Sequence, residues 1–123
     1  MDKETVFTQL KWSIQAMACD SETQIALFPE FIVASDEIVT DFDHWKRTVE
    51  SRYKSEFSLG QIESLNQINR VIDRISRSDE EIWDNESLTT HELWGELRDA
   101  GTHALNEFHW KLEAPSTSRS IFL

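Results

Sequence analysis

Residues that break or staple a chain are scarce in this sequence. Only three Gly and two Pro occur among 123 residues, which favours long helices over a loop-rich fold. The single cysteine, Cys19, excludes an internal disulfide framework. No apolar run approaches the length of a membrane span, and the polar start Met1-Asp2-Lys3-Glu4 leads into no signal peptide. We therefore expect a soluble, cytoplasmic protein of one domain.

Large apolar side chains are present in the numbers that a folded core needs. The apolar fraction is 39%, with five Trp and seven Phe, and a chain of this length buries roughly two-thirds of its unfolded surface. The net charge of −11 disfavours nucleic acid and anionic membranes as partners, because their phosphates repel carboxylates. This charge favours a basic protein as partner.

The acidic residues are segregated along the chain. Fourteen of the 23 acids fall in two stretches, 20–43 and 79–96, that contain no Lys or Arg. Their acids are Asp20, Glu22, Glu30, Asp36, Glu37, Asp41 and Asp43 in the first stretch, and Asp79, Glu80, Glu81, Asp84, Glu86, Glu92 and Glu96 in the second. Residues 46–77, between the two stretches, carry seven bases against four acids. Charge sorted in this way gives a folded domain a field of one sign, which steers and selects an oppositely charged partner.

Apolar residues recur at helical spacing in four segments, at about 3–18, 36–54, 59–77 and 90–110. A short helix is expected from Ser21 to no further than Phe28, because Pro29 follows, and a single helical turn near 80–83. The predicted N-caps, three of them with Gln or Glu at capping-box spacing, are Asp2, Ser21 (Gln24), Ser35, Ser58 (Gln61) and Thr89 (Glu92). The bulky run 28–34 has no evident partner strand, so we predict a buried connector or the first turn of the next helix.

These segments predict an all-α fold, a single-domain helical bundle of four main helices plus one or two short ones, over residues 1–114. Residues 115–123 are expected to form a flexible C-terminal tail, and docking of Ile121, Phe122 and Leu123 onto the bundle stays open. The small residues Gly95 and Gly101 lower the helix propensity by about 1 kcal/mol each. Their size also permits a close helix contact.

Ionisable side chains give no convincing catalytic, metal or cofactor motif. Asp41 and His44 are three residues apart on a helix, but no second acid-x-x-His pair completes a dimetal site. A metal- or ligand-binding bundle also needs inward-facing polar groups, and the predicted stripes are almost wholly apolar. Other candidate residues lack ligand or catalytic spacing: His91, His103, His109 and Cys19. We therefore expect no enzymatic activity.

Two tryptophans lie among the acids of the second stretch, Trp83 in a predicted loop and Trp94 near the start of a helix. Exposed aromatic residues among charges are typical of protein-binding surfaces, although each ring could instead cover the core under a loop. The predicted partner-binding residues are Glu80, Glu81, Trp83, Asp84, Glu86, Asp36, Asp41, Asp43 and Trp94.

In size, acidity, tryptophan content and lack of a catalytic motif, the whole chain resembles the small immunity proteins of bacterial toxin systems, of the contact-dependent inhibition and bacteriocin types. The resemblance implies a protein that neutralises a basic toxin domain, often a nuclease, by stoichiometric inhibition, with carboxylates in place of phosphates. The alternative is a non-inhibitory helical adaptor or regulatory subunit, perhaps homodimeric through its Trp surface. The toxin's chemistry, the dominant acidic stretch and the oligomeric state stay open.

Overall fold

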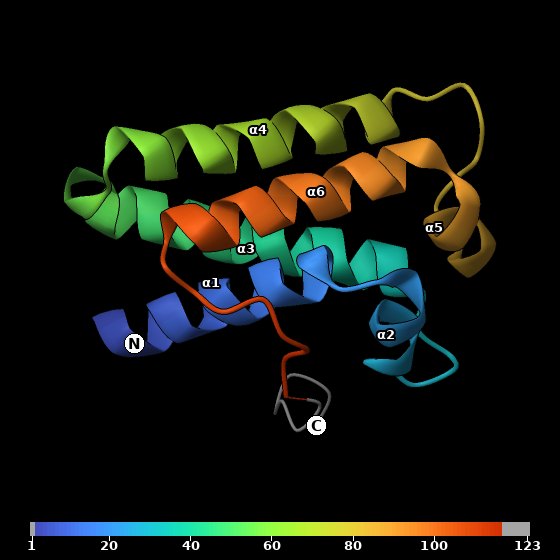
Figure 1. The fold of residues 1–123 in the computed structure, drawn as a ribbon, viewed down its shortest axis with the longest axis horizontal. Helices are drawn as coiled ribbons and strands as arrows, with labels where there is room; N and C mark the ends of the chain where they lie inside the picture. Colours follow the sequence, from blue (N-terminus) through green and yellow to red (C-terminus); the bar gives the residue numbers. More distant parts are fainter. Residues whose placement is uncertain (1, 117–123) are drawn as a thin grey trace.

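The computed structural model describes residues 2–116, and within them the chain forms helices and no strand (Figure 1). Four long helices form the bundle: α1 (Lys3–Ala18), α3 (Ala34–Tyr53), α4 (Leu59–Ser76) and α6 (Glu92–Glu107). The short elements are α2 (Ser21–Ala26), α5 (Asn85–Thr90) and the 3₁₀ turn η1 (Lys54–Glu56). The predicted all-α bundle of four main helices and two short ones is confirmed.

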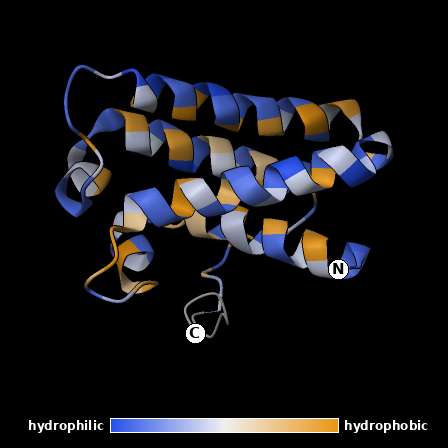
Figure 2. Cartoon of the chain, turned by 180° about the vertical axis from the view of Figure 1, so that it is seen from behind, coloured by the Kyte–Doolittle hydropathy of each residue, from blue (hydrophilic) through white to orange (hydrophobic). Residues whose placement is uncertain are grey.

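The long helices alternate in direction, and α1 packs against both α3 and α6, while α4 packs against α6 (Figure 1). Each contributes an apolar face to one shared core, and these faces turn inward in Figure 2. Core residues that are fully buried include Leu10, Ile14, Met17, Ile38, Phe42, Leu65, Ile68, Ile75, Trp94 and Leu105. Among residues 2–116, each helix is too short or too polar to cross a bilayer.

Two of the predicted helix starts are confirmed in atomic detail. The Asp2 carboxylate accepts a hydrogen bond of 2.8 Å from the backbone N–H of Thr5. Ser58 and Gln61 form a reciprocal capping box at the start of α4, with hydrogen bonds of 2.9 and 3.1 Å. Each side chain satisfies a backbone N–H that the first helical turn leaves without an intrahelical partner.

The other predicted caps are wrong. Helix α2 is capped by Asp20, whose carboxylate accepts from Thr23 N–H, and not by Ser21. Helix α3 begins one residue before Ser35, which is buried, after an N-cap that makes no side-chain hydrogen bond. Helix α6 begins at Glu92 and is capped by His91, not by Thr89, and the turn expected near 80–83 is replaced by α5.

Gly101 marks a close helix contact, as its size permits. A Cβ atom built on Gly101 would lie 3.3 Å from both the backbone N of Ala18 and Cγ of Met17. Gly95 has open space by comparison, since a Cβ there would meet only Nη2 of Arg98 at 3.8 Å. The approach of α1 and α6 therefore depends on Gly101 and not on Gly95.

The chain after α6 turns back across α1 (Figure 1). His109 adopts a left-handed backbone with φ 59°, and Trp110 N–H donates to Leu105 O at 2.9 Å, as in a Schellman-type helix end. Farther on, Pro115 is buried, and the Ser116 carbonyl accepts a hydrogen bond of 2.7 Å from Trp12 Nε1. The predicted tail therefore begins at a buried residue, Pro115, followed by a residue that is hydrogen-bonded to α1. The predicted flexibility and docking of residues 117–123 lie outside the described residues.

Candidate functional site

The two acidic stretches meet at one end of the bundle. Helices α3 and α6 both begin there, and α5 packs against α2, α3 and α6 (Figure 1). We call this region the acidic end and define it by ten exposed acids in α2, α5, the adjoining loops and the first turns of α3 and α6. They are Asp20, Glu22, Glu30, Asp36, Asp79, Glu80, Glu81, Asp84, Glu86 and Glu92.

The local structure explains why acids gather at these positions. Four helices start at this end, and a helix N-terminus favours negative charge because its free N–H groups and its dipole are positive. Asp20 and Asp84 each accept a backbone N–H as the N-cap of a short helix, at 2.8 and 2.7 Å. The hydrogen bonds from Thr23 lower the pKa of the Asp20 carboxyl, so this residue stays ionised at neutral pH.

One arginine inside the acidic end ties its elements together. Arg98 of α6 donates from Nη1 to the Leu88 carbonyl of α5 at 2.9 Å and to Gln24 Oε1 of α2 at 3.3 Å. Gln24 is buried, and its Nε2 donates to the carbonyls of Ala16 and Met17 at the end of α1. Partial burial lowers the pKa of the Arg98 guanidinium, and Asp99 and Asp20 oppose this shift. Because the Arg98 guanidinium joins α6 to both α5 and α2, we call it the Arg98 clamp.

The charge of Arg98 acts on Asp20, but ion pairs with basic residues do not neutralise the acidic end. Among residues 2–116, none of its ten carboxylates forms an ion pair with Lys or Arg. The two exposed arginines near the end of α4 pair elsewhere, Arg74 with Glu96 at 2.7 Å and Arg77 with Asp73 at 3.0 Å. Glu80 lies 3.9 Å from His91 Nε2, while Nδ1 of that ring accepts a hydrogen bond from Leu93 N–H. The negative charge is thus available to a partner.

Five of the nine predicted partner-binding residues are exposed at the acidic end: Asp36, Glu80, Glu81, Asp84 and Glu86. Trp83 is half-buried beside them, with its ring edge-on to Trp94 at 5.2 Å between centroids. Its accessible part could contribute to a contact.

The other three predicted residues lie in different surroundings. Trp94 is 1% exposed, and its Nε1 donates to the Ile82 carbonyl at 2.9 Å, so it belongs to the core. Asp41 is 8% exposed and accepts from Trp45 Nε1. Asp43 is compensated by Arg47 at 3.1 Å. None of the three presents an uncompensated surface group to a partner.

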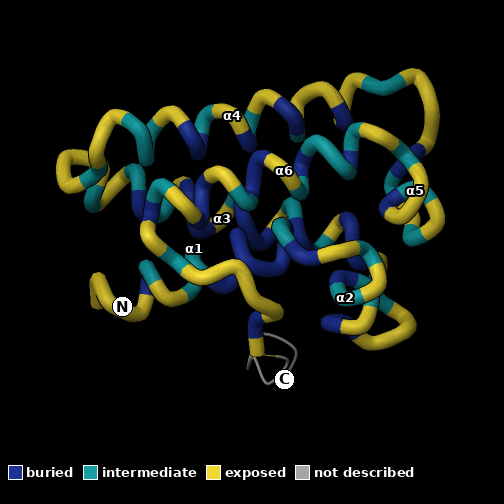
Figure 3. The backbone as a smooth tube through the Cα atoms, viewed as in Figure 1, coloured by how far each residue is buried: buried dark blue, intermediate teal, exposed yellow. Residues whose placement is uncertain are grey.

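An exposed aromatic residue at this end was missed from the sequence. Phe31 is 86% exposed and Val33 is 41% exposed, although the run 28–34 was predicted to be a buried connector or the first turn of the next helix. Both lie in the loop between α2 and α3, most of which is solvent-exposed (Figure 3). Pro29, which favours a turn at this point of the chain, was the available signal.

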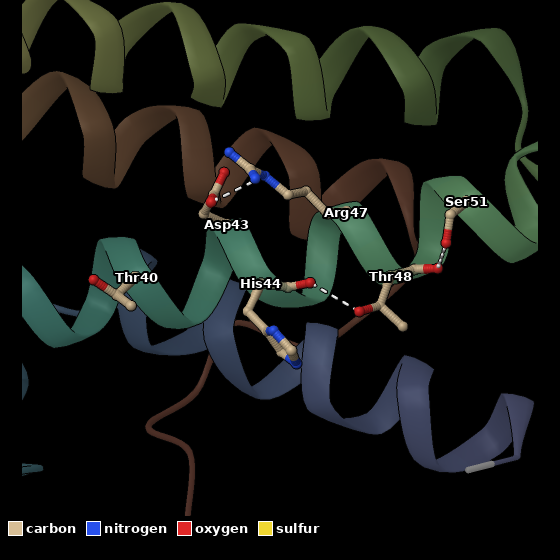
Figure 4. A pocket seen from close by; sticks show the side chains of 6 residues that line it. All are labelled: Thr40, Asp43, His44, Arg47, Thr48 and Ser51. Atoms are coloured by element: carbon tan, nitrogen blue, oxygen red, sulfur yellow. Dashed lines mark hydrogen bonds and ion pairs between the residues drawn. The ribbon is translucent and has the colours of Figure 1, made fainter.

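A hollow of about 440 Å³ lies along α3, lined by Thr40, Asp43, His44, Arg47, Thr48 and Ser51 (Figure 4). All six residues come from one helix, and Figure 4 shows Arg47 turned to Asp43 and the Thr48 hydroxyl donating to the His44 carbonyl at 2.9 Å. The side chains of these residues do not converge on a point (Figure 4). Within residues 2–116, no group of three His, Cys, Asp or Glu side chains could hold a metal ion.

The single thiol of the sequence, Cys19, directly precedes Asp20 of the acidic end. Cys19 is buried, and its Sγ donates to the Gln15 carbonyl at 3.1 Å. Burial, and secondarily the charge of Asp20, raises the pKa of the Cys19 thiol. A protonated, covered thiol is a poor nucleophile.

Comparison with known proteins gives no match: no family model fits the chain, and no curated protein or solved structure is significantly similar to it.

Proposed function

We propose that this chain is an immunity-type binding protein, which neutralises a basic toxin domain by covering a cationic surface with the acidic end. The observation that carries the proposal is the gathering of ten exposed carboxylates, unpaired with Lys or Arg among the described residues, at one end of a rigid bundle. A nuclease must bind phosphates, so its substrate surface is positive, and carboxylates held in a fixed array can occupy it in place of phosphates.

Binding by such a surface has a kinetic signature. Complementary charge steers the encounter and raises the association rate by one to three orders of magnitude at low salt. Exposed charges are screened over about 8–10 Å at ordinary ionic strength. The association rate should therefore fall steeply with salt, whereas dissociation should respond less.

Two variants with the same net charge separate the place of the charge from its amount. The acid-end variant carries Glu80→Gln, Glu81→Gln and Glu86→Gln. The control variant carries Glu4→Gln, Glu63→Gln and Asp99→Asn. Each loses three negative charges from the net −11, and every replaced residue is exposed. Circular dichroism and urea unfolding should show that both variants keep the fold, because Gln and Asn retain an acceptor oxygen at each position.

The wild-type chain and both variants, immobilised in parallel, are used to capture proteins from cells of the source organism. The proposal expects a basic protein retained by the wild type and the control variant and lost from the acid-end variant. Its basic domain, expressed alone in a test host, should stop growth, and co-expression of the wild-type chain should restore it. A captured partner that is harmless would instead favour an adaptor. Equal retention of the basic protein by the acid-end variant and the wild type would contradict the proposal.

A further inference from the structure

Phe31 is held outward by the fold. A turn places it at the third of four residues, with Ile32 N–H donating to the Pro29 carbonyl at 3.0 Å. On one side, Phe28 is buried with its ring edge-on to Trp12 at 6.3 Å. On the other side, Ile32 packs against the core and Ala34, which begins α3, is buried. An aromatic ring that is 86% exposed thus projects from a loop fixed at both ends.

The exposure of the Phe31 ring is energetically unfavourable in the free protein. An exposed Phe leaves a large apolar surface in water. Single exposed apolar residues are nevertheless common and need no special explanation. This one differs because Val33 is exposed in the same loop and because that loop carries Glu30 of the acidic end and leads into the first turn of α3, where Asp36 lies. Interfaces place an aromatic residue at the centre and charges around it, since the ring supplies affinity and the charges supply orientation. A ring fixed beforehand also loses little conformational entropy on binding.

We propose that Phe31, with Val33 beside it, inserts into an apolar pocket of a basic protein, while Lys and Arg around that pocket meet the carboxylates of the acidic end. Charge complementarity selects this occupant: a second copy of the chain would bring a further net charge of −11 against the same surface. The inference rests on the proposed function and adds the apolar contact that an acidic surface alone lacks.

The chain supplies a matched control residue. Leu59 is also 86% exposed, and as the first residue of α4 it lies at the opposite end of the bundle (Figure 1). The photo-crosslinking residue benzoylphenylalanine is introduced in place of Phe31 in one sample and of Leu59 in the other. Both samples are irradiated in the source cells, and crosslinked proteins are identified by mass spectrometry. A crosslink to one basic protein at position 31 and none to it at position 59 is expected.

The identified protein is then purified, and its affinity for the wild type, Phe31→Ser and Leu59→Ser is measured at several salt concentrations. Loss of a central aromatic contact should weaken binding by about 30-fold. This loss should lie mainly in faster dissociation, with the salt dependence of association unchanged. Leu59→Ser should bind like the wild type. The acid-end variant should show the reverse pattern, with slower and less salt-sensitive association.

The outcomes distinguish the inference from the proposed function. If the basic partner is lost with the acid-end variant but binds Phe31→Ser normally, the inference is wrong and the proposed function stands. A crosslink from position 31 to a second copy of the chain, or to residues 117–123 of the same chain, also overturns the inference. If neither position crosslinks to a basic protein and capture recovers none, both fail.

Discussion

Removal of the Arg98 clamp should loosen the acidic end. In Arg98→Met, an apolar stem of similar length is kept, whereas the guanidinium that joins Leu88 of α5 to Gln24 of α2 is lost. Helices α2 and α5 have six residues each, too few to persist without tertiary contacts. We therefore expect a local effect on these helices as well as a lower global stability.

The size of the effect follows from the two hydrogen bonds. A hydrogen bond to a charged donor contributes about 1.5–3 kcal/mol. The bond to Gln24 is long at 3.3 Å, and Arg98 is only partly buried, so solvent screens part of the interaction. Release of the guanidinium to water in the unfolded chain offsets a further share. We expect a loss of about 2 kcal/mol in the free energy of unfolding, or roughly 8 °C in Tm for a domain of this size.

Urea unfolding followed by tryptophan fluorescence measures this loss, and hydrogen exchange locates it. Arg74→Met is the matched control, because the exposed pair of Arg74 with Glu96 should contribute at most about 1 kcal/mol. Amide exchange in Arg98→Met should rise most in residues 21–26 and 85–90. Equal losses for the two variants, or faster exchange spread evenly over the long helices, would refute the clamp.

Three further predictions concern the packing and the helix ends. Gly101→Ala should lower the free energy of unfolding by about 1–2 kcal/mol, because its Cβ would press on the α1 backbone. Gly95→Ala, in open space, should raise it by up to about 1 kcal/mol. Thermal unfolding should therefore show a lower Tm for the first variant and a higher Tm for the second. His109→Gly should stabilise by about 0.5–1 kcal/mol by removing a side chain from a left-handed backbone, and Asn106→Gly, inside α6, should destabilise by a similar amount; urea midpoints that move together would count against this account. The folded pKa of Asp20 lies below 3.8, so its charge stabilises the fold above pH 3.8 and this contribution disappears as the pH falls through the folded pKa. The stability gap between the wild type and Asp20→Asn should therefore close on acidification, and a gap that widens would be the contrary result.

The long helices could be predicted because their apolar residues recur at helical spacing, a pattern that can be recognised without knowledge of the tertiary contacts. Their starts were harder, since a cap depends on backbone conformation as well as on residue type. Ser21 and Asp20 are both good N-cap residues, and only the extended backbone at Asp20 selects it. Ser35 fits the cap pattern of α3, but it is enclosed inside the first turn.

The candidate site depended on contacts between distant parts of the chain. Trp94 is buried because the chain near Ile82 crosses over it, which its neighbours in sequence do not reveal. Asp41 is an acid, a residue type usually found at the surface, yet it accepts a hydrogen bond from Trp45 one turn away. The meeting of the two acidic stretches follows from topology: α3 and α6 run in the same direction and begin at the same end (Figure 1). Alternating directions put the starts of α3 and α6 at the same end, but alternation does not tell which helices pack side by side.

The association rate of the captured partner as a function of salt tests whether the acidic end receives a cationic protein. Stopped-flow measurement compares the wild type with the acid-end and control variants, which carry equal net charge. The account predicts that the acid-end variant associates about tenfold more slowly at low salt and with a shallower salt dependence, while the control variant follows the wild type. Identical rates for the two variants at every salt concentration would contradict it.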